Sequence, residues 1–208
     1  LDFFVVQPMH GQCECGTVHW RRPVAAACGS ARRGRRGAGR ANFDADLDVA
    51  VEACINGAFF STGQRCTASS RLIVTEGIHD RFVEAMKARM VTLKIGDALA
   101  AETHIGPVVD AKQLQQDEDY IRIAREEGGE VFGGEHVPGA SKGYFLAPAL
   151  ITGTNNAMRI NREEVFGPVL SIIPFEDDEE AIEIANDTIY GIASGVWTSN
   201  IRRAFVMA

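Results

Sequence analysis

The sequence predicts an α/β domain over residues 43–208, with a mostly parallel sheet flanked by helices. Short apolar runs have the length and composition of buried strands; they are 72–75, 131–132, 169–175 and 192–197. Apolar positions at helical spacing lie around them, at about 47–58, 80–90, 110–127 and 178–186, and a last helix starts near 200. Because strands alternate with helices of this length, parallel pairing with helices on both faces of the sheet is favoured.

Composition excludes several classes of protein. The chain has 208 residues, of which 46% are hydrophobic, so it can bury a sizeable core. No apolar run approaches the roughly 18 residues that cross a bilayer, and the opening residues lack a basic leader, so we expect no membrane partner. Five cysteines without framework spacing fit a reducing cytoplasmic location better than a disulfide scaffold.

Residues 1–42 differ from the rest of the chain in charge and complexity. They hold seven arginines against two acidic residues, a net charge of +5, whereas the remainder carries −12. The run 29–40 is rich in Arg, Gly and Ala and offers no packing face, so we expect this head to be disordered. Its composition is also that of a GC-rich gene read out of frame. The acidic remainder has no nucleic-acid footprint.

Two patterns in the head admit a binding role. His10, Cys13, Cys15 and His19 could offer four zinc ligands, but their C-x-C spacing is tighter than zinc sites use, and we expect no metal. The glycines 34, 37 and 39 have the reverse of the spacing of a dinucleotide loop. The arginines lack the interleaved aromatic residues of a nucleic-acid platform, so we expect no nucleic-acid partner.

Cys66 is the candidate nucleophile. It lies in the turn-like segment 60–70, between an apolar helical run and the strand 72–75. Gly63 allows the backbone to reverse, and the small residues after Cys66 leave its sulfur accessible. Free backbone N–H groups at a helical turn would favour the thiolate, which is the reactive form. The alternative is a small cysteine that merely fills a turn.

Four segments together resemble the aldehyde dehydrogenase family. They are the cysteine segment with Gly63-Gln64-Arg65-Cys66, the glycine-aromatic-proline stretch 142–150, the E-E-x-F-G-P segment within 158–169, and the A-N-D-T-x-Y-G segment 185–193. Their order and spacing match the family from about residue 43 to 208, so the resemblance implies its catalytic domain, incomplete here. The cysteine and E-E-x-F-G-P segments are most similar to the branch acting on 2-oxoglutarate semialdehyde and other acid semialdehydes.

The resemblance implies a reaction and roles for residues. Cys66 would attack an aldehyde to form a thiohemiacetal, hydride would pass to NAD or NADP, and the resulting thioester would be hydrolysed to a carboxylate. Glu164 would bind the ribose hydroxyls beside the nicotinamide, and Phe166 would pack against the nicotinamide ring. Arg65 would attract a substrate carboxylate, or serve only as a structural arginine. Full-length members form homo-oligomers.

The resemblance also implies missing parts. The family's E-L-G-G-K glutamate, which activates the hydrolytic water, has no counterpart in 32–40, and the family extends beyond both ends of this chain. We therefore expect impaired turnover. Two alternatives remain: a non-catalytic interaction or assembly module that uses the arginine-rich head, and a cofactor-independent esterase activity of Cys66.

Overall fold

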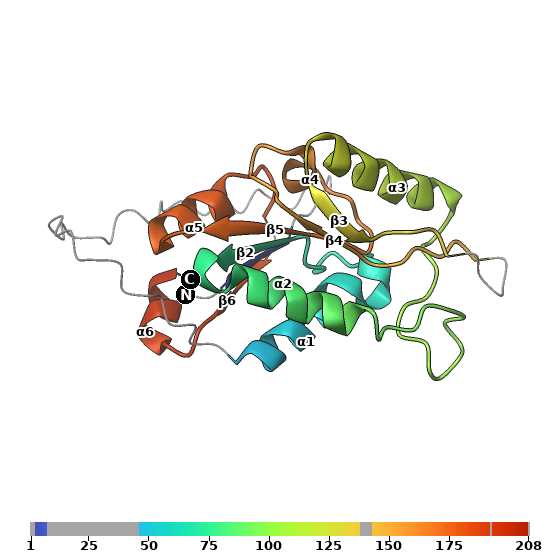
Figure 1. Ribbon diagram of the computed structural model, residues 1–208, viewed down its shortest axis with the longest axis horizontal. Coiled ribbons are helices and arrows are strands. Elements are labelled where there is room, and N and C mark those ends of the chain that lie inside the picture. Colours follow the sequence, from blue (N-terminus) through green and yellow to red (C-terminus); the bar gives the residue numbers. More distant parts are fainter. Residues whose placement is uncertain (1–2, 8–45, 138–142, 192, 208) are drawn as a thin grey trace, which may run out of the picture.

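The computed structural model describes residues 3–7, 46–137, 143–191 and 193–207. Within them a six-stranded sheet has the order β3-β4-β5-β2-β1-β6 (Figure 1). The strands are β1 Phe3–Gln7, β2 Arg71–Thr75, β3 Glu130–Gly133, β4 Ala149–Thr152, β5 Val169–Phe175 and β6 Ala193–Trp197. The helices are α1 Leu47–Phe59, η2 Phe60–Gly63, α2 Glu76–Met90, α3 Ala111–Glu126, α4 Arg159–Arg162, α5 Asp178–Asn186 and α6 Ile201–Met207. The predicted α/β class is confirmed.

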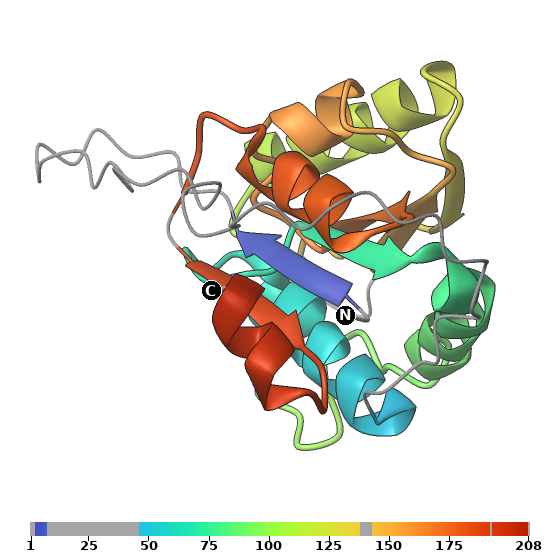
Figure 2. The ribbon, with the colours of Figure 1, turned by 90° about the vertical axis from the view of Figure 1, so that its left-hand side faces the viewer.

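Parallel pairing is concentrated in the centre of the sheet. β4 pairs with β5, and β5 with β2, both in parallel. The outer strands are antiparallel to their neighbours: β3 to β4, and β1 to both β2 and β6. Figure 2 shows β1, in blue, between β2 and β6. Parallel neighbours need a crossover connection. The chain between β2 and β4 includes α2, and the chain between β4 and β5 includes α4.

β1 is contributed by the described part of the head, residues 3–7. The sequence predicts no packed structure in residues 1–42, yet Phe3–Gln7 pair with both β2 and β6. This run is aromatic and β-branched, which suits a strand, but five residues are too few to display a period. The rest of the head, including the arginine-rich run, the zinc-like pattern and the three glycines, lies outside the described residues.

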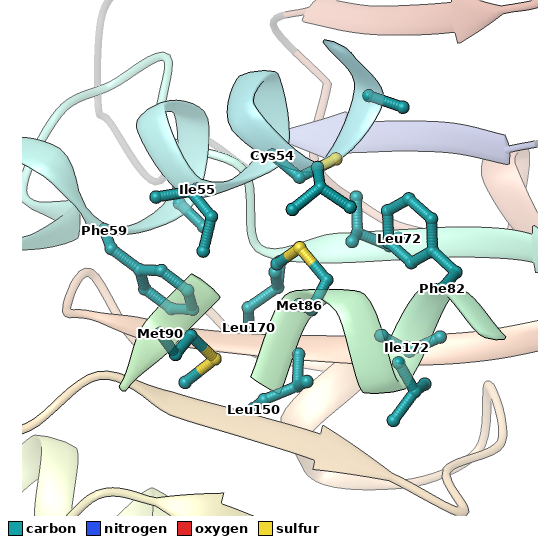
Figure 3. Packing of buried hydrophobic residues seen from close by; sticks show 14 of the residues in the cluster. Cys54, Ile55, Phe59, Leu72, Phe82, Met86, Met90, Leu150, Leu170 and Ile172 are labelled. Atoms are coloured by element: carbon teal, nitrogen blue, oxygen red, sulfur yellow. The ribbon is translucent and has the colours of Figure 1, made fainter. Parts of the chain in front are cut away.

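Helices α1 and α2 cover one face of the sheet. The side chain of Asp46 caps α1 by accepting hydrogen bonds from the N–H groups of Asp48 and Val49. Helical spacing then directs one stripe of α1 and one of α2 onto β2, β4 and β5, as Figure 3 shows. The residues labelled there are Cys54, Ile55, Phe59, Leu72, Phe82, Met86, Met90, Leu150, Leu170 and Ile172.

Helices α3, α4 and α5 cover the opposite face (Figure 1). Alternate strand residues point to opposite faces, so Leu72 meets α1 and α2 whereas Ile73 packs with α5. Not every apolar residue of α3 is buried: Ala111 is exposed in the first turn. The buried face of α3 instead includes a carboxyl group, that of Asp117.

Phe82 provides a test of this core. Its side chain is fully buried between α2, α1 and the sheet. Phe82→Ala is therefore expected to lower the free energy of unfolding by about 3–5 kcal/mol, because it removes apolar contacts and leaves a cavity. Urea unfolding followed by circular dichroism measures this. Val91→Ala, at a side chain that is 71% exposed, is the control and should change stability by less than about 0.5 kcal/mol.

Candidate active site

Cys66 lies in the loop that connects η2 to β2, and its side chain is exposed. Three consecutive residues before it, Ser61, Thr62 and Gly63, have left-handed backbone conformations, with φ of 55°, 58° and 66°. The N–H of Ala68 then donates to the carbonyl of Arg65 at 2.9 Å and closes a turn around the cysteine. The chain thus reverses sharply and presents the thiol on an exposed turn, as the sequence predicts.

Hydrogen bonds to residues 106–109 hold this strained loop in place. The hydroxyl of Thr62 donates to the carbonyls of Gly106 and Pro107, at 3.3 and 3.4 Å. The amide oxygen of Gln64 accepts from the N–H of Val109 at 3.0 Å. A non-glycine residue in the left-handed region costs on the order of 1 kcal/mol, so it persists only when its surroundings fix it. These contacts supply that fixation.

The segment 163–167 lies directly against the cysteine loop. A β-carbon added to Gly63 would overlap the carbonyl oxygen of Gly167, so the two backbones approach more closely than any side chain allows. The structure therefore brings together two motifs that are about a hundred residues apart in the sequence. Gly63 has a double role, because its positive φ and its missing side chain are both required here.

A small pocket is formed where these two segments meet. Gly63, Arg65 and Ser69 line it from the cysteine side, and Glu164, Phe166 and Gly167 line it from the other. Two of the three predicted site residues thus border one cavity. Cys66 follows the pocket-lining Arg65 in the chain but does not itself line this cavity. The site consequently has two adjacent parts, an exposed thiol and a pocket with a carboxylate and an aromatic ring.

Glu163 and Glu164 have different environments. The Arg159 guanidinium pairs with Glu163 through two contacts of 2.8 and 2.9 Å, and the Tyr120 hydroxyl donates to Glu163 at 2.7 Å. These partners hold the pKa of Glu163 below its usual range, Arg159 having the larger effect. Glu163 therefore anchors the segment to α3 and α4, whereas Glu164 lines the pocket. Of the two neighbouring glutamates, Glu163 thus has a structural position and Glu164 a pocket-lining one.

Phe166 has a left-handed backbone, with φ of 60°, and its side chain is 38% exposed. The carbonyl of the preceding Val165 accepts hydrogen bonds from the side-chain amides of Gln113 and Gln116, at 3.1 and 2.8 Å. Helix α3 thereby fixes the backbone on which Glu164 and Phe166 are carried. An aromatic face left accessible beside a carboxylate is suited to a flat ring joined to a sugar.

Arg65 makes structural hydrogen bonds to α1 and also lines the pocket. Its Nη2 donates to the carbonyls of Asn56 and Gly57, at 2.6 and 3.2 Å, which are in the last turn of α1. The last carbonyls of a helix lack intrahelical partners, and a cation stabilises them. The same side chain contributes to the pocket wall, so its positive charge is held beside the site.

The two described cysteines differ in burial. Cys54 is buried in α1, and burial raises the pKa of its thiol to about 12, so almost none of it is thiolate at neutral pH. Iodoacetamide at pH 8 is therefore expected to modify Cys66 and to leave Cys54 unmodified in the folded chain. Peptide mass spectrometry measures both, and denaturation in urea should expose Cys54. Equal modification of both in the folded chain would contradict this assignment.

Among the described residues, no group of three or more His, Cys, Asp or Glu side chains is arranged to hold a metal ion. No helix in the described ranges is long and apolar enough to cross a membrane.

The domain is an α/β sheet that carries an exposed cysteine turn next to a carboxylate-bearing loop. The family model for the aldehyde dehydrogenase family matches residues 42–208. The chain belongs to this family.

Curated relatives match along most of the chain. Betaine aldehyde dehydrogenase from Bacillus subtilis is 44% identical over 163 residues, which cover 77% of this chain and 33% of that protein. Alpha-ketoglutaric semialdehyde dehydrogenase from the same organism is 42% identical over 163 residues, with the same coverage of both chains. The chain thus spans about a third of the length of these relatives.

Solved structures of aldehyde dehydrogenases also match this chain. Betaine aldehyde dehydrogenase from Staphylococcus aureus, in complex with NAD+, superposes with a TM-score of 0.75 at 38% identity, covering 79% of this chain and 33% of that one. An indole-3-acetaldehyde dehydrogenase complexed with NAD+ gives a TM-score of 0.77 at 40% identity, covering 80% and 34%. These likenesses agree with the family resemblance predicted from the four sequence segments.

Proposed function

We propose that this chain carries the nucleophile and the nicotinamide side of an NAD-dependent aldehyde dehydrogenase. The observation that carries the proposal is the contact between Gly63 and Gly167, which sets the cysteine loop beside the segment of Glu164 and Phe166. A carboxylate accepts both hydrogen bonds of a vicinal diol, and an aromatic ring stacks on a planar heterocycle. The residues present therefore fit the ribose and nicotinamide of a cofactor such as NAD+, which the structural relatives contain.

In the proposed mechanism the Cys66 thiolate attacks the aldehyde carbon. A C–S bond forms, and the carbonyl π electrons move to oxygen to give a thiohemiacetal. NAD+ or NADP+, when bound, supplies the acceptor for the hydride that leaves this carbon. As the hydride leaves, the C=O bond re-forms and a thioester remains on Cys66. Water then adds to the thioester carbon and the C–S bond breaks, which releases a carboxylate, the Cys66 thiolate as a good leaving group, and two protons to the solvent.

The roles of Glu164 and Phe166 in this mechanism are binding and orientation. Glu164 would hold the ribose hydroxyls, and Phe166 would pack against the nicotinamide ring. Hydride transfer needs close approach and alignment of donor and acceptor, so orientation contributes strongly to rate. The anchoring of Glu163 by Arg159 and of Val165 by Gln113 and Gln116 supports this orienting role.

The proposed substrate class is an acid semialdehyde. The positive charge of Arg65, held at the pocket wall, attracts a carboxylate through the electrostatic field even while Nη2 bonds to α1. The relative that acts on alpha-ketoglutaric semialdehyde is consistent with this class. Arg65→Gln is expected to weaken adduct formation with succinate semialdehyde more than with uncharged butanal. Equal loss for both aldehydes would assign Arg65 a purely structural role.

Isothermal titration of the 208-residue chain with NAD+ tests the cofactor proposal. Glu164→Gln should weaken binding by about tenfold, because it removes a charged acceptor from two hydrogen bonds. Glu179→Gln, at an exposed side chain of α5, is the matched control and should leave the affinity unchanged. Binding by the wild type with no difference between the two variants would contradict the role of Glu164. Competition by NADP+ in the same experiment identifies the preferred cofactor.

A further inference from the structure

Asp117 is a buried carboxyl group on the face of α3 that meets the segment 163–167. Its exposure is 0%, and it occupies the same helical face as Leu114 and Ile121, three residues after the first and four before the second. A β-carbon added to Gly167 would overlap both carboxyl oxygens of Asp117. The carboxyl group therefore packs directly against the backbone of Gly167, beneath the wall of the proposed cofactor pocket (Figure 1 shows α3 beside α4).

A short chain of hydrogen bonds connects Asp117 to the pocket. The side-chain amide of Gln113 donates to Oδ1 of Asp117 at 2.7 Å, and the same nitrogen donates to the carbonyl of Val165 at 3.1 Å. Gln116 donates independently to Val165 at 2.8 Å. Because Val165 is bonded covalently to both Glu164 and Phe166, the state of Asp117 is linked to their placement through Gln113.

The second carboxyl oxygen has no such support. Oδ2 of Asp117 is buried and has no hydrogen-bond partner among the described residues. Burial raises the pKa of Asp117 to about 7, the hydrogen bond from Gln113 opposes this shift, and the charge of Glu118 adds to it. The ionised form is thus the unfavourable one in this position.

Charged groups on the elements packed against Asp117 do not compensate an ionised carboxylate. On the segment 159–167, Arg159 is paired with Glu163, and Arg162 with Asp187. Tyr120, on α3 itself, donates to Glu163. Glu118 on α3 is acidic and adds like charge rather than a counter-ion.

We propose that Asp117 is a positioning residue that holds the segment 163–167 against the cysteine loop when it is neutral and loosens that segment when it ionises. This inference rests on the proposed function, because it assigns the 163–167 segment a cofactor to hold. The neutral carboxyl fits under Gly167 without a charge to solvate. The ionised carboxylate gains from moving toward water, and the backbone of Gly167 lies on its surface, so that segment is displaced first.

The first test follows backbone amide signals by NMR in the 208-residue chain between pH 5.5 and 8.5. In the wild type, the amides of Val165 and Gly167 are expected to titrate with a midpoint of about 7. In Asp117→Asn, which keeps the shape of the side chain, this titration should vanish. Asp119→Asn, on the same helix in an ion pair with Arg122, is the control and should retain it. Persistence of the titration in Asp117→Asn would overturn the proposal.

The second test measures NAD+ affinity at pH 6 and pH 8. We take the pKa of Asp117 to be about one unit higher when the segment is held than when it is loosened. Linkage then makes NAD+ binding by the wild type about fivefold weaker at pH 8 than at pH 6. Asp117→Asn should show a ratio near one. The same fivefold dependence in Asp117→Asn would overturn the positioning role. If NAD+ binds to none of these proteins, the proposed function fails, while the amide titration still decides whether Asp117 governs the segment.

Discussion

Cys66→Ala is expected to abolish the covalent chemistry of the cysteine loop. With p-nitrophenyl acetate, the folded wild type should release a burst of p-nitrophenolate as the thiolate is acylated. The variant should lose about one equivalent of that burst, because the alanine side chain has no nucleophile to be acylated. Stopped-flow absorbance measures both the amplitude and the rate.

Cys54→Ala is the matched control for this experiment. Its thiol is buried with a pKa of about 12, so the burst should be unchanged. A burst that survives in Cys66→Ala at full amplitude would remove Cys66 from the proposed mechanism. Continued turnover of the ester by the wild type, with no dependence on NAD+, would instead favour the cofactor-independent esterase activity.

Gly63→Ala is expected to be the most damaging substitution in the cysteine loop. Alanine is strained at φ of 66°, and its β-carbon would overlap the carbonyl oxygen of Gly167, which is backbone and cannot rotate away. The free energy of unfolding should fall by about 2–4 kcal/mol, or the two segments should separate with loss of the pocket. Urea unfolding and NAD+ titration distinguish these two outcomes.

Substitutions at two other glycines distinguish the cost of backbone strain from the cost of the β-carbon overlap. Gly128 has φ of 99° but open space where a β-carbon would lie, so Gly128→Ala should cost about 1 kcal/mol from the backbone alone. Gly191 has open space and no positive φ, and Gly191→Ala should be close to neutral. If Gly63→Ala were no more destabilising than Gly128→Ala, the close approach of the two loops would be refuted.

The sequence predicted the helices and the long strand well because their periods are long enough to read. The residues that α1 and α2 bury recur at helical spacing, and β5 matches the predicted strand at both ends. Helix α2 begins at Glu76 rather than near 80: its first turn includes Gly77, a poor helix former, although Ile78 beside it is buried. The strands β1 and β4 were missed because β1 lies in a head whose composition indicated no packing, and β4 lies at the end of a stretch that was interpreted only as a family motif.

The antiparallel edges of the sheet could not be predicted from the alternation of elements. That alternation favours crossovers, and crossovers specify parallel neighbours, as between β4, β5 and β2. Pairing of β1 with β2 and β6 joins segments that are far apart in sequence, and nothing local in Phe3–Gln7 selects its partners. Such pairing depends on the assembled sheet rather than on local sequence preferences.

The site was predicted residue by residue but not in its geometry. Cys66, Glu164 and Phe166 are named by the family motifs, whereas the contact that brings their segments together depends on two glycines with no side chains to signal it. Asp117 was missed although its spacing from Leu114 and Ile121 marks it as a carboxyl on an apolar face. A charged residue at a buried position of a helix is the signal that would have found it.

Carbon-13 NMR of the chain with an aldehyde labelled at its carbonyl carbon tests the central claim, that Cys66 is the nucleophile. Thiohemiacetal formation converts the trigonal carbonyl carbon into a tetrahedral carbon bonded to sulfur, and this step needs neither the cofactor nor hydrolysis. With a labelled acid semialdehyde, a signal for a sulfur-bound tetrahedral carbon should appear in the wild type and in Cys54→Ala and be lost, by one equivalent per chain, in Cys66→Ala. A signal of equal intensity in all three proteins, or none in the wild type, would contradict the claim.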